Sequence, residues 1–354
     1  MSAEQPTPAG AQDQLENALE LKETEGLSQT QIVRRRFFRH RGAVIGLVVL
    51  VLIVVVGFTS IGFGPIPGWW DKAPISRYPV VNPQGAPTVS MPTWLGGTGF
   101  ALGDHPMGQD ELGRDNFAMT MRGVQTSIMV MVILGLVATT IGLIVGSLAG
   151  YYRGRSDQVL MRITDFIIIL PALVIGAVLG KQFGTASPAP LAIVLGLVVW
   201  PGLARLVRSE FFSLREREFV DAARVAGASD SRIIFKHILP NAMGVIIVNT
   251  TLLLSTAILL ETSLSYLGFG IKFPNVSLGW QISEYQSAFA TRPWLFWWPG
   301  LFIVAIALAV NFVGDGLRDA FDPRQKRIPS ERKMARAARR QAASVGTSNA
   351  QATP

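Results

Sequence analysis

The stretch His105–Phe117 (HPMGQDELGRDNF) gathers residue types that could carry out acid–base chemistry. A histidine beside carboxylates can pass a proton to or from a substrate when the fold brings these groups within hydrogen-bonding distance. The same stretch is rich in turn residues, because Gly108 and Gly113 fit tight turns, and a long apolar run follows it closely. The candidate residues are His105, Asp110, Glu111, Arg114 and Asp115.

The other residues that could do chemistry give little support for an enzyme or a cofactor site. The chain has no cysteine, which excludes disulfides, thiolate metal sites and thiol nucleophiles. His40, His105 and His237 are too far apart in sequence to match a metal-binding motif. The closest approach to a phosphate-binding loop, Gly176-x-x-x-Gly180-Lys181, has the wrong interval. We therefore predict no catalytic residue, no metal and no cofactor on this chain.

The composition indicates a protein that lies in a membrane. Charged residues make up 16% of the 354 residues and hydrophobic residues 49%, against roughly 25% charged residues in an ordinary soluble domain. Ala43–Phe63 has no charge and would form about 31 Å of helix, which matches a hydrocarbon core of ~30 Å. Five further apolar runs give six predicted spans: Gly123–Tyr152, Phe166–Gly180, Gln182–Ala204, Ile238–Leu260 and Pro293–Gly314. Pro171 interrupts the third span, and Pro201-Gly202 is a kink candidate in the fourth.

Lysine and arginine residues near the ends of these runs orient the spans, because cytoplasmic loops carry an excess of both. Five arginines without an acid precede the first span, whereas the loop 64–122 has four basic and five acidic residues. Seven basic residues lie between Arg205 and Lys236, and the tail from Arg318 to Arg340 has nine against three acids. This alternation predicts that both termini are cytoplasmic. The net charge of +8 is then explained by the basic residues that orient the spans in the membrane, and no nucleic-acid partner is expected.

The segment Glu218–Asn241 is polar although apolar runs flank it on both sides. Twelve charged residues lie between Arg205 and Lys236, and burying them in hydrocarbon would cost on the order of 30 kcal/mol. We therefore expect this segment in the cytosol or at the membrane surface that faces it.

A helical hairpin is predicted within this segment. Phe219, Ala222, Ala223 and Ala226 recur at i, i+3, i+4 and i+7, which is one face of a short helix. Gly227 then supplies a turn with positive φ. The second helix is expected to begin with a cap at Ser229 or Asp230, run through Lys236 and be closed by Pro240.

Three interpretations of the hairpin remain open: a loop that packs on its own helix ends, a DNA-binding helix-turn-helix, and a docking element for a cytosolic motor. DNA binding is disfavoured, because the second helix runs straight into a membrane span and leaves nothing free to enter a groove. The alanine-rich face allows close approach of another backbone, which suits a helix held in the cleft of another protein.

Five segments of the sequence resemble a known family. Asp221-Ala222-Ala223, Gly227 and Leu239-Pro240 resemble the EAA loop of ABC-importer permeases, which reads E-A-A, three residues, G, a fixed interval and L-P. Aspartate replaces glutamate at position 221, and histidine occupies a usually apolar place at 237. Four further segments are similar, in order, to the C-type permease of dipeptide and oligopeptide importers: His105–Phe117, Asp157–Leu173, Glu261–Gly270 and Gly314–Arg324.

The resemblance, which covers about Arg34 to Arg324, implies an all-α polytopic membrane protein with six transmembrane helices and the type I ABC importer permease fold. It implies a heterodimer with a homologous B-type permease subunit, two cytosolic ATP-binding subunits and an extracytoplasmic substrate-binding protein that delivers peptide. The hairpin 215–240 would couple ATPase closure to the spans. Its coupling residues would be Glu218, Phe219, Asp221, Ala222, Ala223, Ala226, Gly227, Asp230 and Arg232. The resemblance also implies that the stretch His105–Phe117 is an entrance and packing segment.

Polar residues of the fifth span are candidates for lining a translocation pathway. Asn249 and Thr256 are seven residues apart and share a helix face, and Glu261 lies at the outer end of the span, where we expect water to reach it. Pathway lining, hydrogen bonding between helices and an outer gate all remain open for these residues. At the inner rim, Asp165 lies three residues after Arg162, which predicts an ion pair on the helix surface.

Three glycines of the second span predict close helix contact. Gly142, Gly146 and Gly150 repeat at intervals of four residues and form a flat strip. Contact within this subunit and contact across the heterodimer both remain open.

We expect five regions in a multi-pass protein of the bacterial plasma membrane: a cytoplasmic polar tail (1–33), a basic anchor with the first helix (34–63), an extracytoplasmic loop (64–122), the permease core (123–318) and a basic cytoplasmic tail (319–354). The main alternative substrates are nickel, sugars or other small solutes. A stand-alone ion-coupled carrier is disfavoured, because it would need buried acids in the middle of a span. The acids associated with the predicted spans, Asp165 and Glu261, both lie at span edges.

Overall fold

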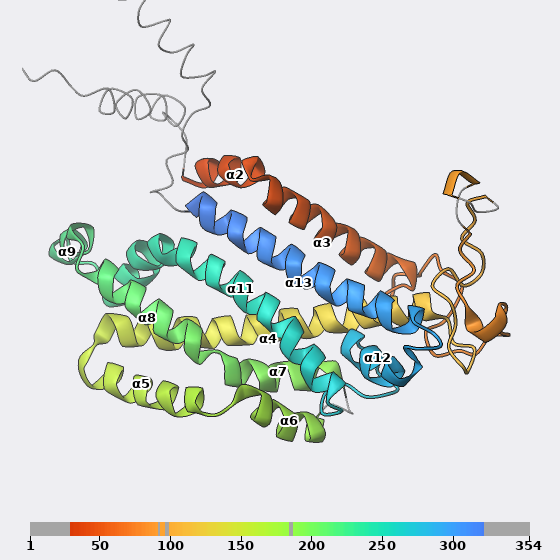
Figure 1. Cartoon of the computed structure of the whole chain (residues 1–354). Coiled ribbons are helices and arrows are strands. Elements are labelled where there is room, and N and C mark those ends of the chain that lie inside the picture. The colour runs from red at the N-terminus through yellow and green to blue at the C-terminus, as the bar shows by residue number, and fades with distance from the viewer. Residues whose placement is uncertain (1–28, 91–92, 96–98, 184–186, 322–354) are drawn as a thin grey trace, which may run out of the picture. The chain divides into compact units, whose positions relative to one another are not determined.

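The computed structural model describes residues 29–90, 93–95, 99–183 and 187–321 (Figure 1). The chain divides into two units, of which one comprises residues 37–318 and the other residues 1–36 with 319–354. In the latter unit, the described residues 29–36 and 319–321 are helical, as parts of α2 (Gln29–Arg39) and α13 (Trp294–Phe321). The predicted tails lie almost wholly outside the described residues.

The part of the chain that the structure describes is helical, with isolated β-bridges and no strand. Four helices are each long and apolar enough to cross a membrane: α3 (Arg41–Ser60), α4 (Asn116–Tyr152), the helix from Asp230 to Tyr266, and α13. Two bent pairs supply the remaining spans, namely α5 (Gly154–Ile169) with α6 (Ala172–Phe183), and α7 (Pro188–Val199) with α8 (Pro201–Arg215). The described helices therefore agree with the prediction of six spans.

Both bends occur where proline was expected to interrupt a span. The axes of α5 and α6 differ by 79°, because Leu170 takes an extended conformation before Pro171, as the proline ring favours for the residue that precedes it. The axes of α7 and α8 differ by 47°. Pro201 is the first residue of α8, a position where its missing N–H costs nothing.

The predicted end of the hairpin at Pro240 is wrong. α10 (Asp230–Arg232), the π-helical turn η3 (Ile233–Ile238) and α11 (Leu239–Tyr266) form one continuous helix from Asp230 to Tyr266. A proline inside a helix lacks an N–H and its ring crowds the preceding turn. The widened π turn directly before Leu239 relieves this crowding, so the helix passes through Pro240 without a break.

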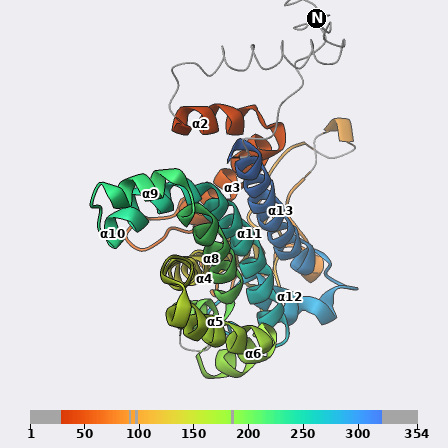
Figure 2. The same ribbon diagram turned by 90° about the vertical axis from the view of Figure 1, so that its left-hand side faces the viewer.

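The helix α4 lies at the centre of the unit 37–318. It packs against α3, α5, α7, α8, α11 and α12 (Leu278–Tyr285), and Figure 2 shows it between α8 and α5. Its buried side chains Val124 and Leu134 join a core with Leu195 of α7, Ile258 of α11 and Ile306 of α13. The apolar residues of α4 extend around the whole helix, since other helices cover most of it and its remaining side, which includes Leu136 and Ile144, is part of the exposed apolar surface.

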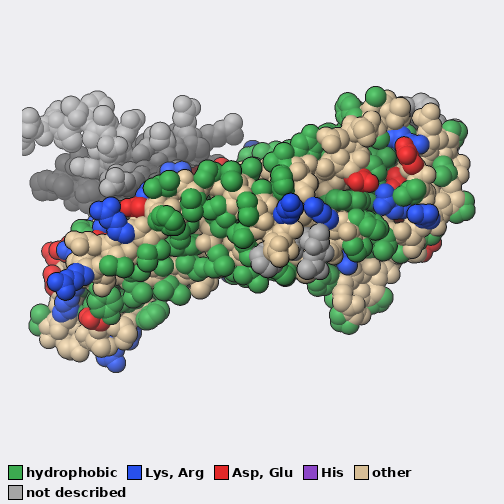
Figure 3. Space-filling model, turned by 90° about the horizontal axis from the view of Figure 1, so that it is seen from below, with side chains coloured by type: hydrophobic (Ala, Val, Ile, Leu, Met, Phe, Trp, Pro, Cys, Tyr) green, Lys and Arg blue, Asp and Glu red, His purple; other side chains and the backbone are tan. Residues whose placement is uncertain are grey.

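The outer surface of the spans is apolar. In the view of Figure 3, hydrophobic side chains cover most of the middle of the molecule's face, and charged side chains gather mainly toward the two ends. On α3, Val48, Leu52 and Val55 are all exposed. Large contiguous apolar surfaces of this kind are rare on soluble proteins and fit a lipid surrounding.

Three short 3-10 helices complete the described elements: η1 (Pro83–Gly85), η2 (Thr93–Leu95) and η4 (Gln286–Ala288). The first two belong to the loop between α3 and α4, and the third follows α12.

Candidate functional site

The predicted hairpin lies between α8 and α11 and consists of α9 (Glu218–Val225) and α10 (Figures 1 and 2). Gly227 has a φ of 80°, as the turn predicted here requires. The N–H of Gly227 donates to the carbonyl of Arg224 at 2.9 Å, which ends α9. An added Cβ at Gly227 would meet nothing within 4 Å, so glycine serves the backbone conformation here and not close packing. Ser229 occupies the N-cap position of α10, without a side-chain capping bond.

The face of α9 that was predicted to approach another protein is exposed at three of its four residues. Val220 and Ala223 are buried and pack with Val207 and Phe211 of α8. Of the predicted face, Phe219, Ala222 and Ala226 are exposed. The remaining predicted coupling residues are exposed as well: Glu218, Asp221, Gly227, Asp230 and Arg232. Because Val220 provides more apolar area than any alanine, it sets which side of this short helix turns inward.

Two further apolar residues of the hairpin are exposed, although the sequence did not lead us to predict them as contact residues. Val225 is 90% exposed at the end of α9, and Phe235 is 68% exposed in the π turn. The sequence carried a signal for Val225, since it lies two residues after Ala223 and therefore on the opposite side of the helix. Together with Ala222 and Ala226, these side chains give the hairpin an apolar outer surface that can contact another protein. We call Ala222, Val225, Ala226 and Phe235 the hairpin outer surface.

Polar contacts fasten the hairpin to the ends of α4 and α8. The hydroxyl of Tyr151, on α4, donates to Asp230 Oδ1 at 2.6 Å. Arg215 donates to the carbonyl of Tyr151 at 2.5 Å, and Arg153 forms an ion pair with Glu216 at 2.5 Å. The hairpin is therefore held to the end of α4, which is held in turn to the end of α8.

Two ion pairs join α5 to α8. Arg208 contacts both carboxylate oxygens of Asp157, at 2.5 and 2.6 Å, and Arg205 contacts Asp165 at 2.5 Å. The predicted pairing of Asp165 with Arg162 on its own helix is therefore wrong. The side of α5 that carries both aspartates faces α8, which brings Asp165 within reach of a guanidinium from the neighbouring helix.

The three glycines of α4 face α8 of the same chain. An added Cβ at Gly146 would lie 2.5 Å from the carbonyl oxygen of Ala204, and one at Gly150 would lie 2.7 Å from the carbonyl oxygen of Arg208. At Gly142 the nearest atoms, 3.1 Å away, belong to Leu203. The strip thus serves close packing within this subunit.

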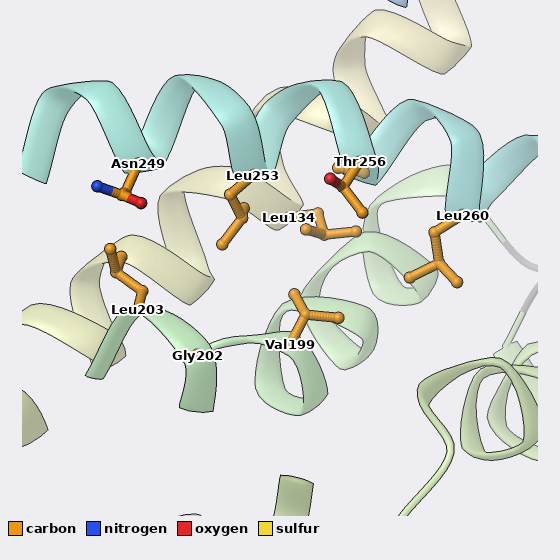
Figure 4. A pocket seen from close by; sticks show the side chains of 9 residues that line it. Leu134, Val199, Gly202, Leu203, Asn249, Leu253, Thr256 and Leu260 are labelled. Atoms are coloured by element: carbon orange, nitrogen blue, oxygen red, sulfur yellow. The ribbon is translucent and has the colours of Figure 1, made fainter. Parts of the chain in front are cut away.

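A pocket of about 250 Å³ lies between α11 and the bend from α7 to α8 (Figure 4). Asn249 and Thr256, which were predicted to share a face, both line it. Each also donates to its own helix, Asn249 to the carbonyl of Val245 at 2.8 Å and Thr256 to that of Leu252 at 3.1 Å. Their side-chain oxygens are left as acceptors on a wall whose other residues are Leu134, Val199, Gly202, Leu203, Leu253, Ala257 and Leu260.

Glu261 does not line this pocket, and the expectation that water reaches it is wrong. Its side chain is fully buried and accepts hydrogen bonds from Ser127 at 2.9 Å and from Ser265 at 2.7 Å. Ser127 also accepts the N–H of Leu278, the first residue of α12, at 3.3 Å. Glu261 therefore joins α4, α11 and α12, because α12 folds over the outer end of α11.

Asp115, in the stretch first considered for catalysis, caps α4. Its Oδ2 accepts the N–H of Ala118 at 2.8 Å and the indole N–H of Trp70 at 2.9 Å. Its Oδ1 lies 2.7 Å from Nδ1 of His105, and both side chains are buried. These bonds fix the start of α4, as an N-cap aspartate commonly does.

Asp110 and Arg114 form a second buried group in this stretch. Asp110 Oδ2 accepts from Arg114 Nε at 2.6 Å and from the hydroxyl of Tyr285, on α12, at 3.0 Å. Burial, and then the charge of Asp110, raise the pKa of Tyr285 well above its ordinary value, so this hydroxyl keeps its proton. Glu111 pairs with Arg292 at the surface. The described residues contain no group of histidine and carboxylate side chains that could hold a metal ion. These contacts assign the stretch to packing.

The fold and the site together define a polytopic α-helical membrane protein with a polar hairpin, apolar on its outer surface, between its fourth and fifth spans. Residues 142–327 match the family described as binding-protein-dependent transport system inner membrane component. Residues 28–67 match the N-terminal transmembrane domain of oligopeptide transport permease C. The chain belongs to the family of binding-protein-dependent transport system inner membrane components.

Two curated relatives show how far the similarity extends. The oligopeptide transport system permease protein OppC of Mycobacterium tuberculosis (strain ATCC 25618 / H37Rv) is 34% identical over 306 residues, which cover 86% of this chain and 98% of that protein. The OppC protein of Haemophilus influenzae is 33% identical over 314 residues, with coverage of 89% and 94%. A solved structure of the inward-facing MetNI methionine ABC transporter has a TM-score of 0.47 and 21% identity, over 58% of this chain and 96% of that chain.

Proposed function

We propose that this chain forms half of the transmembrane pathway of an ATP-driven importer of peptides. The observation that carries this proposal is the similarity to oligopeptide transport permeases over 86% of this chain and 98% of the relative. A similarity of this level that covers nearly the whole length of the relative argues for the same role in transport. The names of the relatives supply the substrate class.

The hairpin is proposed as the element that receives force from a cytosolic ATPase subunit. Support comes from the division of its side chains: Val220 and Ala223 hold it to α8, while the hairpin outer surface is free of contacts with the chain's own core. An exposed valine next to exposed alanines offers an apolar, closely approachable surface. The contacts of Tyr151 and Arg215 would pass motion of the hairpin to α4 and α8.

The pocket beside α11 is proposed as part of the translocation pathway. Asn249 and Thr256 present hydrogen-bond acceptors that suit the N–H groups of a peptide backbone. The leucines around them make apolar contacts that do not select one side chain. Such a lining fits a substrate class with a constant backbone and variable side chains.

The assembly proposed is a heterodimer with a homologous B-type permease subunit, two ATP-binding subunits and an extracytoplasmic substrate-binding protein. Both chain termini and the hairpin would face the cytoplasm of a bacterial cell. No ATP hydrolysis is assigned to this chain.

Val225→Asp tests the coupling role. If an ATPase subunit covers this residue, an unpaired carboxylate buried in the contact costs more than ~1.4 kcal/mol, which is a factor of 10 in binding. Peptide uptake into cells that express the variant should fall about tenfold or more, and the ATPase subunits should no longer co-purify with it. Uptake of radiolabelled dipeptides and longer peptides, with nickel and sugar uptake measured in parallel, gives both the rate and the substrate class.

Val225→Thr is the matched control, because threonine keeps the branched shape and adds no charge. It should retain most of the uptake, and the amount of both variants in the membrane should equal that of the unmodified chain. Unchanged peptide uptake by Val225→Asp would rule out the hairpin as the coupling element. Uptake of nickel or sugar instead of peptide would refute the substrate class alone.

A further inference from the structure

A charge-free stretch continues beyond the end of the first span. Residues from Gly42 to Trp70 include no charged side chain, yet α3 ends at Ser60. Ten apolar or small residues therefore follow the helix, and three of their large side chains are exposed: Phe63, Ile66 and Trp69. We refer to these three as the collar. The collar lies at the end of α3 opposite to Arg41 and the arginines before it.

The chain turns back on α3 directly after the helix ends. Gly62 and Gly64 have φ values of 76° and 57°, which only glycine adopts readily. The N–H groups of Phe63 and Ile66 each donate to the other's carbonyl, at 3.0 and 3.1 Å. A Cβ at Gly62 would lie 2.7 Å from the backbone nitrogen of Gly68, so the segment that returns toward α3 runs close beside the turn.

Contacts with the last turn of α3 fix the height of the collar. The ring of Phe63 packs against that of Phe58, with centroids 5.0 Å apart. The indole N–H of Trp69 donates to Thr59 Oγ1 at 3.3 Å, and its backbone N–H donates to the Thr59 carbonyl at 3.4 Å. Phe63 and Trp69 thus lie level with the final turn of a membrane-spanning helix.

Trp69 and the neighbouring Trp70 differ in their surroundings, because Trp70 packs inside the chain and Trp69 does not. Trp70 turns toward α4, where its indole N–H donates to Asp115 at 2.9 Å and its ring packs at a tilt against that of Phe117, with centroids 4.8 Å apart. The ring of Trp69 has wider contacts, with Phe117 at 6.0 Å and Trp70 at 6.1 Å, and the side chain remains 62% exposed. Ile66 is 58% exposed.

We propose that the collar is a membrane-binding surface, in which Phe63, Ile66 and Trp69 lie in the lipid headgroup region and set the depth of α3. Thr59, which accepts hydrogen bonds from Trp69, follows Val48, Leu52 and Val55 at helical spacing on the exposed apolar face of α3, so the lipid that surrounds this face also reaches Trp69. Tryptophan gathers at the membrane–water interface, because its ring is apolar while its N–H needs a polar partner. The collar has no charged side chain to oppose contact with the acyl chains below the headgroups, and interfacial tryptophans of this kind fix the tilt and depth of a helix.

Site-specific fluorescence quenching tests this membrane contact. The chain has no cysteine, so Trp69→Cys and Ile66→Cys each give a single attachment site for an environment-sensitive fluorophore. The full chain is reconstituted in phosphatidylcholine nanodiscs, alone and after addition of the subunits that co-purify with it. We expect lipids that carry a nitroxide near the headgroup to quench most of the fluorescence at both positions, and iodide in the water to quench little.

Asp71→Cys is the matched control, because this side chain is 77% exposed two residues after Trp69. It should show the reverse pattern, with strong quenching by iodide. Iodide quenching at positions 66 and 69 equal to that at position 71 would overturn the proposal. Protection from both quenchers in the assembled complex would also overturn it, since a protein partner would then cover the collar. Ile66→Cys guards against a fold defect in Trp69→Cys, because Ile66 joins the turn through its backbone.

Discussion

At the scale of single residues, Glu261 shows most clearly what the sequence leaves out. Its position near the end of an apolar run predicted a carboxyl group in contact with water. The structure buries it, because α12 returns over the end of α11 and Ser127 of α4 reaches it from the side. The fold of a segment some 17 residues further along the chain decides this burial, and local hydrophobicity carries no information about it.

Glu261→Ala is predicted to destabilise the protein more than Glu261→Gln. Alanine leaves the hydroxyls of Ser127 and Ser265 without their acceptor in a buried site, which costs about 1–3 kcal/mol for each group. Glutamine keeps one carbonyl oxygen and should cost less. Thermal unfolding in detergent, followed by intrinsic fluorescence, measures the difference as a lower Tm for the alanine variant.

Thr256→Ala is the control, since this side chain lies in a pocket and bonds only to its own helix. It should shift Tm little. Equal Tm values for the alanine and glutamine variants at position 261 would contradict a hydrogen-bonding role for this carboxyl group.

At the scale of elements, most of the fold could be predicted because charge marks where spans cannot continue. Six charge-free runs gave six spans, and Pro171 and Pro201 marked the bends of 79° and 47°. The extents of the helices were less predictable. The third span was predicted to begin at Phe166, yet α5 begins at Gly154, and its Asp157 and Asp165 pair with arginines of α8. Ion pairs between distant segments cannot be read from local sequence.

The eight residues of α9, in the hairpin, also show that contacts with distant segments cannot be read from local sequence. Its existence, its turn at Gly227 and its polar character followed from the sequence, but the inward face of α9 did not. The alanine pattern matched helical spacing, and Val220 matched it as well. Only the apolar surface of α8, which Val207 and Phe211 form, shows that Val220 packs inward and Val225 outward.

Gly146→Ala is predicted to destabilise the contact between α4 and α8. Alanine is favoured over glycine in a helix by roughly 1 kcal/mol, so helix propensity alone would stabilise the variant. The added Cβ, however, would meet the Ala204 carbonyl at 2.5 Å and Val207 Cβ at 2.7 Å, and overpacking of this kind typically costs about 1–3 kcal/mol. A lower Tm than that of the unmodified chain is expected.

Gly202→Ala provides the control with the opposite sign. An added Cβ there meets nothing within 4 Å, so only the gain in helix propensity remains and Tm should stay equal or rise. If both substitutions shifted Tm in the same direction, close contact along the glycine strip would not be what holds α4 against α8.

At the scale of the whole molecule, the proposed orientation follows from charge and from the hairpin together. The segment from Arg205 to Lys236 has seven basic residues against five acids, and cytoplasmic loops carry such an excess; it also exposes the hairpin outer surface. The loop between α3 and α4 has more acids than bases. With six spans, the proposed orientation would put both termini on the cytoplasmic side together with the hairpin.

Single cysteines in this cysteine-free chain are predicted to report that orientation in intact cells. Ser231→Cys, on the exposed side of α10, should react with a membrane-impermeant maleimide only after the cells are opened. Asp71→Cys should react from outside. Ser231 avoids the hairpin outer surface, so a bound partner is less able to hide it than Val225. Reaction at position 231 in intact cells would place the hairpin outside, where no ATP-driven subunit could reach it, and would refute the coupling role whatever the uptake measurements gave.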